Sequence, residues 1–236
     1  MSRSKMRAKL GWSGLVLLVL VLAVLAYQTW QARAVNYLSY TLVNSLQYVT
    51  LDEVDEALTP YLSQSFWQVD LNALKQRLES LTWVSQARVK RSWPGYIELE
   101  LIEHQPVARW GKDALISDQG VVFYPSDMSD FETWVGLDGD VLQASQVLAL
   151  WREVEIRLQP LAWRVSRLTQ QVDGVMRIEL AQGTTILLDR PQWTTKLARF
   201  VKAYPQISKK LVESAKRFDL RYSNGLAIGR DSTQLN

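Results

Sequence analysis

Few residues in this sequence have the chemistry for catalysis or metal binding. Its single histidine, His104, follows a predicted strand, and no serine or aspartate near it suggests a Ser-His-Asp arrangement. A lone histidine does not form a two-histidine metal site. The chain has no cysteine, which removes disulfides, thiol catalysis and cysteine-ligated metals. No glycine-rich phosphate loop is present, and we expect His104 to be an ordinary polar residue at a strand end.

Carboxylates are the remaining candidates for acid-base chemistry. Asp52, Glu53, Asp55 and Glu56 cluster in sequence, but they lie at a predicted helix start, where acidic side chains complement the helix dipole. A glycosidase needs two carboxylates that face each other in a cleft, so a membrane-anchored cell-wall hydrolase stays as an alternative. We predict no catalytic residue, no metal site and no cofactor.

The formal charge of +3 is a poor guide to the partner. Four basic residues and no acidic ones lie in the first nine positions, which leaves 23 basic and 24 acidic residues in the rest of the chain. A nearly neutral remainder argues against nucleic acid as the partner.

Any site has to be placed relative to the run from Leu10 to Ala32, which contains no charged side chain. Such a run is long enough, at about 1.5 Å per residue, to cross the ~30 Å hydrocarbon core as a helix. Trp12, Tyr27 and Trp30 lie at depths typical of interfacial anchors. The basic residues before the run keep residues 1–9 in the cytoplasm and export the remainder. A cleaved signal peptide is the alternative.

The first exported segment alternates strand and helix signals. A strand is expected around residues 38–43, and Thr50 with Glu53 has the form of a capping box for a helix that Pro60 ends. Leucines at helical spacing follow Asp70 up to Leu81 and predict a second helix. Residues 87–101 then read as a hairpin that turns at Trp93-Pro94-Gly95. Its register would place Arg88 and Lys90 opposite Glu98 and Glu100.

The segment after Trp110 is predicted to be mainly β. A hairpin with positive φ at Gly120, two further hairpin turns at Asp173-Gly174 and Gln182-Gly183, and helices at 141–158 and around 197–204 are expected. A strand from Arg217 to Tyr222 precedes Asn224-Gly225, the strongest turn signal in the chain.

The last expected strand, Leu226 to Gly229, has no later segment obviously available to pair with its outer edge. An open edge exposes N–H and C=O groups and either docks a partner's strand or must be protected. Arg230 or the polar tail 231–236 could supply that protection, and physics alone leaves both possibilities open.

Three stretches together resemble the FtsQ/DivIB family of bacterial cell-division proteins. They are LTWVSQARVKRSWPGYIELELIEHQPVARW at 81–110, KLARFVKAYP at 196–205 and FDLRYSNGLAIG at 218–229. The resemblance implies an α+β fold with a single N-terminal transmembrane helix (10–32) and a POTRA-type β-α-α-β-β domain with its juxtamembrane linker (33–107). A mainly antiparallel β domain with flanking helices (108–230) and a flexible tail (231–236) would follow.

The resemblance also implies a function. It describes a non-enzymatic inner-membrane scaffold of the division septum, with its bulk in the periplasm, that binds FtsB, with FtsL, by strand addition at its last strand. The POTRA-type domain would bind other division proteins. A POTRA-type transport or chaperone module is the alternative. The implied partner-binding residues are Tyr222, Asn224, Gly225, Leu226, Ala227, Ile228, Gly229 and Arg230.

Two positions depart from the family pattern. Arg230 stands where the family often has an aromatic residue, and an arginine that the family uses from an adjoining strand region has no clear counterpart in 172–174. Arg177 is a basic residue that could replace it in space.

Overall fold

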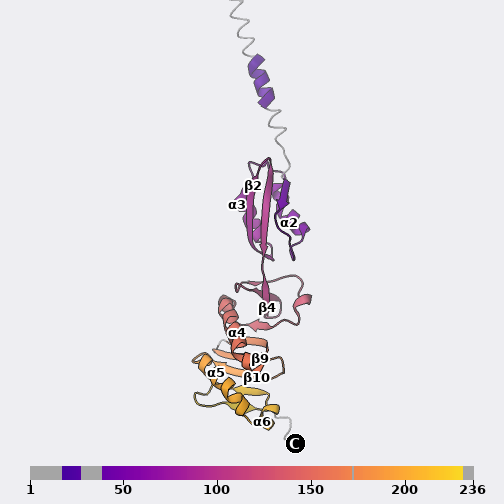
Figure 1. The fold of residues 1–236 in the computed structure, drawn as a ribbon. Coiled ribbons are helices and arrows are strands. Elements are labelled where there is room, and N and C mark those ends of the chain that lie inside the picture. The colour runs from indigo at the N-terminus through magenta and orange to yellow at the C-terminus, as the bar shows by residue number, and fades with distance from the viewer. Residues whose placement is uncertain (1–17, 28–38, 172, 231–236) are drawn as a thin grey trace, which may run out of the picture. The chain divides into compact units, whose positions relative to one another are not determined.

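The computed structural model describes residues 18–27, 39–171 and 173–230 of the 236-residue chain. The chain divides into two compact units, one ending at Glu103 and the other beginning at His104 (Figure 1). Residues 18–27 are helical. Within the described ranges, no helix combines the length and apolar character that a membrane span requires. The rest of the expected span 10–32 and the tails 1–9 and 231–236 lie outside the described residues.

The first unit is a three-stranded sheet with two helices, which confirms the expected order of strand, helix, helix, strand, strand. The sheet order is β1-β3-β2, with β1 parallel to β3 and β2 antiparallel to it. A buried cluster of apolar side chains from the helices and strands forms its core. The elements are β1 (Ser39–Leu42), α2 (Leu51–Leu58), α3 (Leu71–Glu79), β2 (Val84–Ser92) and β3 (Tyr96–Glu103).

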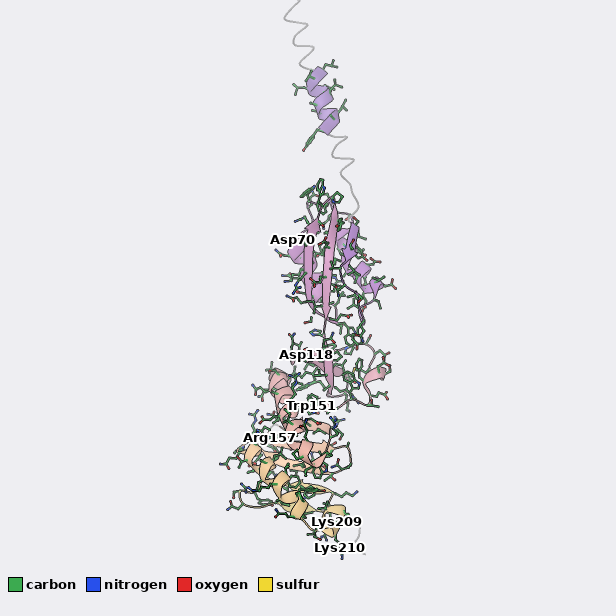
Figure 2. The ribbon with its side chains drawn as sticks, in the orientation of Figure 1. Asp70, Asp118, Trp151, Arg157, Lys209 and Lys210 are labelled. Carbon is green, nitrogen blue, oxygen red and sulfur yellow. The ribbon has the colours of Figure 1, made fainter. Side chains whose placement is uncertain are left out.

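Both helices of this unit begin where the sequence predicts. The Thr50 hydroxyl accepts a hydrogen bond from the Glu53 N–H at 3.3 Å, and the Glu53 carboxylate accepts one from the Thr50 N–H at 2.8 Å. Asp70, labelled in Figure 2, caps α3 by accepting from the N–H groups of its first turn. Leu74 and Leu78 of α3 are completely buried, which confirms that the leucine stripe is core.

The β2–β3 hairpin also has the expected register. Arg88 lies opposite Glu100 and Lys90 opposite Glu98, with N–O distances of 3.0 and 3.6 Å. These pairs are exposed, so each contributes only about 0.2–1 kcal/mol, and they help to fix the register more than the stability.

The second unit is built on a nine-stranded sheet with the order β12-β11-β10-β9-β8-β7-β4-β5-β6. Most neighbours are antiparallel, as expected, but β4–β7, β7–β8 and β10–β11 are parallel. α4 packs on β7 and β8, and α5 packs on β10 and beside α4 (Figure 1). The strands are β4 (Pro106–Trp110), β5 (Ala114–Ser117), β6 (Val122–Phe123), β7 (Gly136–Asp138), β8 (Val165–Gln170), β9 (Val175–Leu180), β10 (Thr185–Asp189), β11 (Arg217–Asp219) and β12 (Ala227–Gly229). The helices are α4 (Ala144–Leu158), α5 (Trp193–Ala203) and α6 (Lys209–Glu213).

The three hairpin turns marked by glycine are confirmed, since Gly120, Gly174 and Gly183 have φ values of +82, +83 and +84°. Only Gly120 is also constrained by space. A Cβ atom there would lie 2.7 Å from the Cα of Ser145 in α4. The β5–β6 turn therefore packs directly against the helix backbone.

The expected strand from Arg217 to Tyr222 is wrong in its second half. β11 ends at Asp219, and residues 220–226 form a connection to β12 instead of a tight turn at Asn224-Gly225. Gly225 does not have a positive φ. The chain turns away after Asp219 because the Asp219 carboxylate accepts hydrogen bonds from both the backbone N–H and the guanidinium of Arg221.

Candidate functional site

The sheet of the second unit ends at β12. β12 pairs antiparallel with β11, with Ala227 opposite Asp219 and Gly229 opposite Arg217. Among the described residues, no strand pairs with the other side of β12. The last strand is therefore a free sheet edge in the part of the chain that the structure covers.

The hydrogen-bonding pattern shows which backbone groups face outward. The carbonyl of Lys216 and the N–H of Leu220 bond to β10 at 3.0 and 2.8 Å. Because the direction of backbone groups alternates along a strand, those of Arg217 and Asp219 face β12. Their partners Gly229 and Ala227 therefore face β11, and the N–H and C=O of Ile228, between them, point to the outer edge.

The side chains around this edge are largely apolar. Ile228 and Leu226 are partly buried and pack against the core of the second unit. Ala227 is exposed, and the side chain of Tyr222, in the connection before β12, is 58% exposed. An incoming strand would meet an apolar base and an aromatic ring.

Two cations of α5 hold the 220–226 connection in place. Lys196 donates to the Asp189 carboxylate at 2.6 Å and to the Arg221 carbonyl at 2.8 Å, and the lysine is only 8% exposed. Arg199 donates to the Ser223 carbonyl at 2.7 Å. These bonds tie the connection to the helix that packs on β10.

The Asp219–Arg221 pair closes the start of the same connection. The guanidinium donates to the two carboxylate oxygens at 2.9 and 2.7 Å. These side-chain hydrogen bonds hold the pKa of Asp219 below its usual value, against the effect of burial. The same contact raises the pKa of Arg221, and the nearby Asp173 adds to that effect.

A cavity of about 210 Å³ lies between α5 and this connection. Apolar atoms from Phe200, Ala203, Leu220 and Leu226 line it, together with Tyr222, Asn224 and Gly225 and the cations Lys196 and Arg199. The cavity can hold one apolar side chain beside the free edge.

The structure thus brings together most of the residues named from the sequence. Tyr222, Asn224, Gly225 and Leu226 line the cavity, and Ala227, Ile228 and Gly229 form the edge strand. Arg230 follows the strand and is exposed. Arg177 lies on β9 and is separated from β12 by β10 and β11.

Sequence reasoning missed the residues that position the site. Asp189, Lys196, Arg199 and Asp219 come from three different elements, and only the packing of α5 on the sheet brings Lys196 and Arg199 to carbonyls 25 and 24 positions away. The stretch KLARFVKAYP contains both cations, but nothing in its pattern indicates which carbonyls they bind.

The residues considered for catalysis have other contacts. The His104 ring stacks on Phe123 with centroids 4.7 Å apart, and burial lowers the pKa of the imidazole. Glu53 caps α2, and Asp55 accepts a hydrogen bond from the Tyr40 hydroxyl. Within the described residues, no group of three or more acidic or histidine side chains could hold a metal ion.

Two family models match the two units in turn. Residues 38–104 match the FtsQ-type POTRA domain, and residues 108–221 match the C-terminal domain of cell division protein FtsQ/DivIB. The chain belongs to the FtsQ/DivIB family. The second FtsQ/DivIB match ends at residue 221, so the free edge at β12 lies beyond the matched range.

Relatives within the FtsQ/DivIB family align with most of the chain. Cell division protein FtsQ of Allochromatium vinosum is 30% identical over 228 residues, which cover 95% of this chain and 89% of that protein. The FtsQ of Actinobacillus pleuropneumoniae is 30% identical, with 91% of this chain and 97% of that protein covered. The FtsQ of Xanthomonas campestris is 32% identical over 77% of this chain and 65% of that protein.

Proposed function

We propose that this protein is a non-enzymatic scaffold of the bacterial division machinery, anchored in the inner membrane by a helix within residues 10–32. The tail 1–9 lies in the cytoplasm, and the domains at 33–107 and 108–230 lie in the periplasm at the division septum. The family supports the division role, and the uncharged run with its preceding basic residues supports the anchor and its orientation.

The scaffold binds FtsB, with FtsL, by adding a strand of FtsB to β12. One observation carries this proposal: the N–H and C=O of Ile228 point away from β11, at an edge where no other described strand pairs. An extended peptide gains main-chain hydrogen bonds from such an edge, and its alternate side chains gain specificity from neighbouring pockets.

The cavity beside α5 supplies such a pocket. It lies next to Leu226, immediately before the edge strand, and Tyr222 forms part of its wall. An apolar side chain of the added strand fills this cavity, and the Tyr222 ring covers it. The pocket therefore selects for an apolar residue in the partner.

The charge around the site favours an acidic partner segment. Residues 185–230 contain ten basic and three acidic side chains, although the chain after residue 9 is nearly neutral. Complementary charge speeds encounter and disfavours wrong partners more than it adds affinity. We therefore expect the segment of FtsB that is added to β12 to carry acidic residues near its strand.

The test is calorimetric titration of the full chain, in detergent micelles, with a peptide from the periplasmic part of FtsB of the same organism. Ile228→Pro removes the outward N–H and leaves the β11–β12 hydrogen bonds in place. We expect it to weaken binding at least about tenfold, or about 1.4 kcal/mol.

The matched control is Ile228→Ala, which also removes the isoleucine side chain but keeps the backbone N–H of residue 228. We expect it to bind more tightly than the proline variant. Ala227→Pro is a poorer probe because the N–H of Ala227 faces β11. Wild-type affinity in the proline variant, with an unchanged circular dichroism spectrum, would count against strand addition at β12.

A further inference from the structure

Two tryptophans of the first unit are largely exposed, Trp67 at 74% and Trp93 at 80%. Trp93 lies in the turn of the β2–β3 hairpin, and Trp67 lies in the connection that leads into α3. The Arg91 guanidinium joins the two regions, because it donates to the carbonyl of Trp67 at 3.4 Å and to that of Val69 at 2.6 Å. Both rings therefore belong to one end of this unit.

The same end receives the chain from its N-terminal side. β1 starts at Ser39, which lies opposite Tyr96 in the parallel pairing with β3. The Ser39 hydroxyl donates to the carbonyl of Gly95, in the hairpin turn, at 3.4 Å. The strand that follows the proposed membrane anchor thus enters the sheet directly beside Trp93.

This end is almost without free charge. Residues 59–69 and 92–97 contain no Asp, Glu, Lys or Arg. The Arg91 donors are directed at backbone carbonyls, and the Asp70 carboxylate caps α3. Little desolvation of charge would oppose transfer of this surface into a less polar environment.

We propose that this end of the first unit, formed by Trp67 and Trp93, docks on the bilayer surface next to the anchor, an inference that rests on the proposed membrane span at 10–32. Six residues separate Ala32 from Ser39, so the hairpin turn stays within about 25 Å of the end of the span even if they are fully extended. Indole rings favour the membrane–water interface, where the ring is desolvated and its N–H stays hydrated. The short distance to the proposed span and the chemistry of the two indole rings therefore both favour a lipid bilayer as the binding partner of this surface.

Tethering makes this docking an intramolecular step. A short linker holds the rings at a high effective concentration near the lipid, so two aromatic side chains suffice where a free domain would need a larger surface. Docking would fix how the first unit stands on the membrane and so restrict the directions in which it presents its other faces.

The natural lack of cysteine allows a clean test on the full chain. Single variants Gln68→Cys, beside Trp67, Ser45→Cys, at the opposite end of the sheet, and Leu20→Cys, in the span, are spin-labelled. Each is reconstituted in vesicles of phosphatidylethanolamine and phosphatidylglycerol. Collisions with oxygen report lipid, and collisions with a water-soluble nickel complex report water. We expect lipid-like values at 20, interfacial values at 68 and aqueous values at 45.

The double change Trp67→Ser, Trp93→Ser should return the label at 68 to aqueous values and leave the label at 20 unchanged. Because both rings are exposed, the thermal unfolding curve should not move. An aqueous label at 68 in the otherwise wild-type chain, with a lipid-like label at 20, would overturn the docking and leave the anchor. An aqueous label at 20 would overturn the anchor itself. Shielding of 68 from both reagents would indicate a protein contact and would also refute lipid docking.

Discussion

Lys196 joins three segments of the second unit at the candidate site, namely α5, β10 and the 220–226 connection. Its ammonium group is buried and bridges a side chain of β10 and a carbonyl of the 220–226 connection. A buried lysine with two fixed hydrogen-bond partners holds those partners together, because few of its interactions with water remain to compete with them. This contact fixes the start of the 220–226 connection, which leads to the edge strand β12.

We therefore expect Lys196→Met to lower the free energy of unfolding of the second unit by about 1–3 kcal/mol, since Asp189 and the Arg221 carbonyl lose a charged donor. The Asp189 carboxylate is 32% exposed, so water compensates in part. Urea unfolding measures the change. Lys202→Met, on the same helix at an exposed position, is the control and should be near neutral. Equal values for the two variants would contradict the structural role.

Asp219 gives the same connection a dependence on pH. Hydrogen bonds from Arg221 lower its folded pKa, so the folded state favours the carboxylate form. The stabilisation is complete above the unfolded pKa of about 3.9 and is lost as the pH falls through the lower, folded value. Asp219→Asn should cost about 1–3 kcal/mol at neutral pH and flatten the loss of stability below about pH 4. Thermal unfolding curves across acid pH measure this, and parallel pH profiles for variant and wild type would exclude the effect.

At the scale of elements, the sequence pattern correctly predicted those features that depend on interactions between residues close in sequence. The capping box at Thr50, the leucine stripe of α3 and the alternating hairpin that includes Arg88 and Glu100 are confirmed, because each depends on residues close in sequence. β7 was not predicted, since three residues show no periodicity. Its parallel pairing with β4 and β8 is decided by tertiary packing.

The candidate site likewise has some features that the sequence indicates and others that only the structure supplies. The sequence shows no later segment obviously available to pair with the final strand, and most of the residues that the resemblance implies as partner-binding lie on one edge and around one cavity in the structure. Which amide faces outward depends on the register between β11 and β12, and only the structure supplies that register. The support from α5 depends on contacts between residues 24 and 25 positions apart.

The contact between the β5–β6 turn and α4 allows a sharp test of packing between elements. Gly120→Ala would place a Cβ atom 2.7 Å from the helix backbone, at a φ of +82°. Gly183 has a similar φ of +84° and no atom within 4 Å of a Cβ position, so Gly183→Ala reports the conformational cost alone, about 1–2 kcal/mol. We expect Gly120→Ala to cost at least about 1–3 kcal/mol more, by urea unfolding. Similar losses for both would show that the turn moves freely away from the helix.

At the scale of the whole molecule, the small net charge hides an uneven distribution of charged residues along the chain. The first nine residues and the segment 185–230 are both strongly basic, and the acidic residues of the chain lie mostly between them. A single overall value therefore suggests no particular partner, while the local excess around α5, α6 and β12 favours an acidic one. The proposed scaffold uses one basic segment to orient the chain in the membrane and the other to receive its partner.

The two units have separate hydrophobic cores that share no residue, one containing Leu78 and the other Ile178. Residues that share one hydrophobic core unfold together as a cooperative unit. Because there are two separate cores, we expect the chain to show two thermal transitions rather than one. Leu78→Ala and Ile178→Ala each remove a fully buried side chain and should cost about 2–5 kcal/mol within their own unit. In calorimetry of the full chain, each variant should lower one transition temperature and leave the other in place. If either change moved both transitions together, the units would be stabilising each other, and a partner bound at β12 could then alter the stability of the POTRA-type domain.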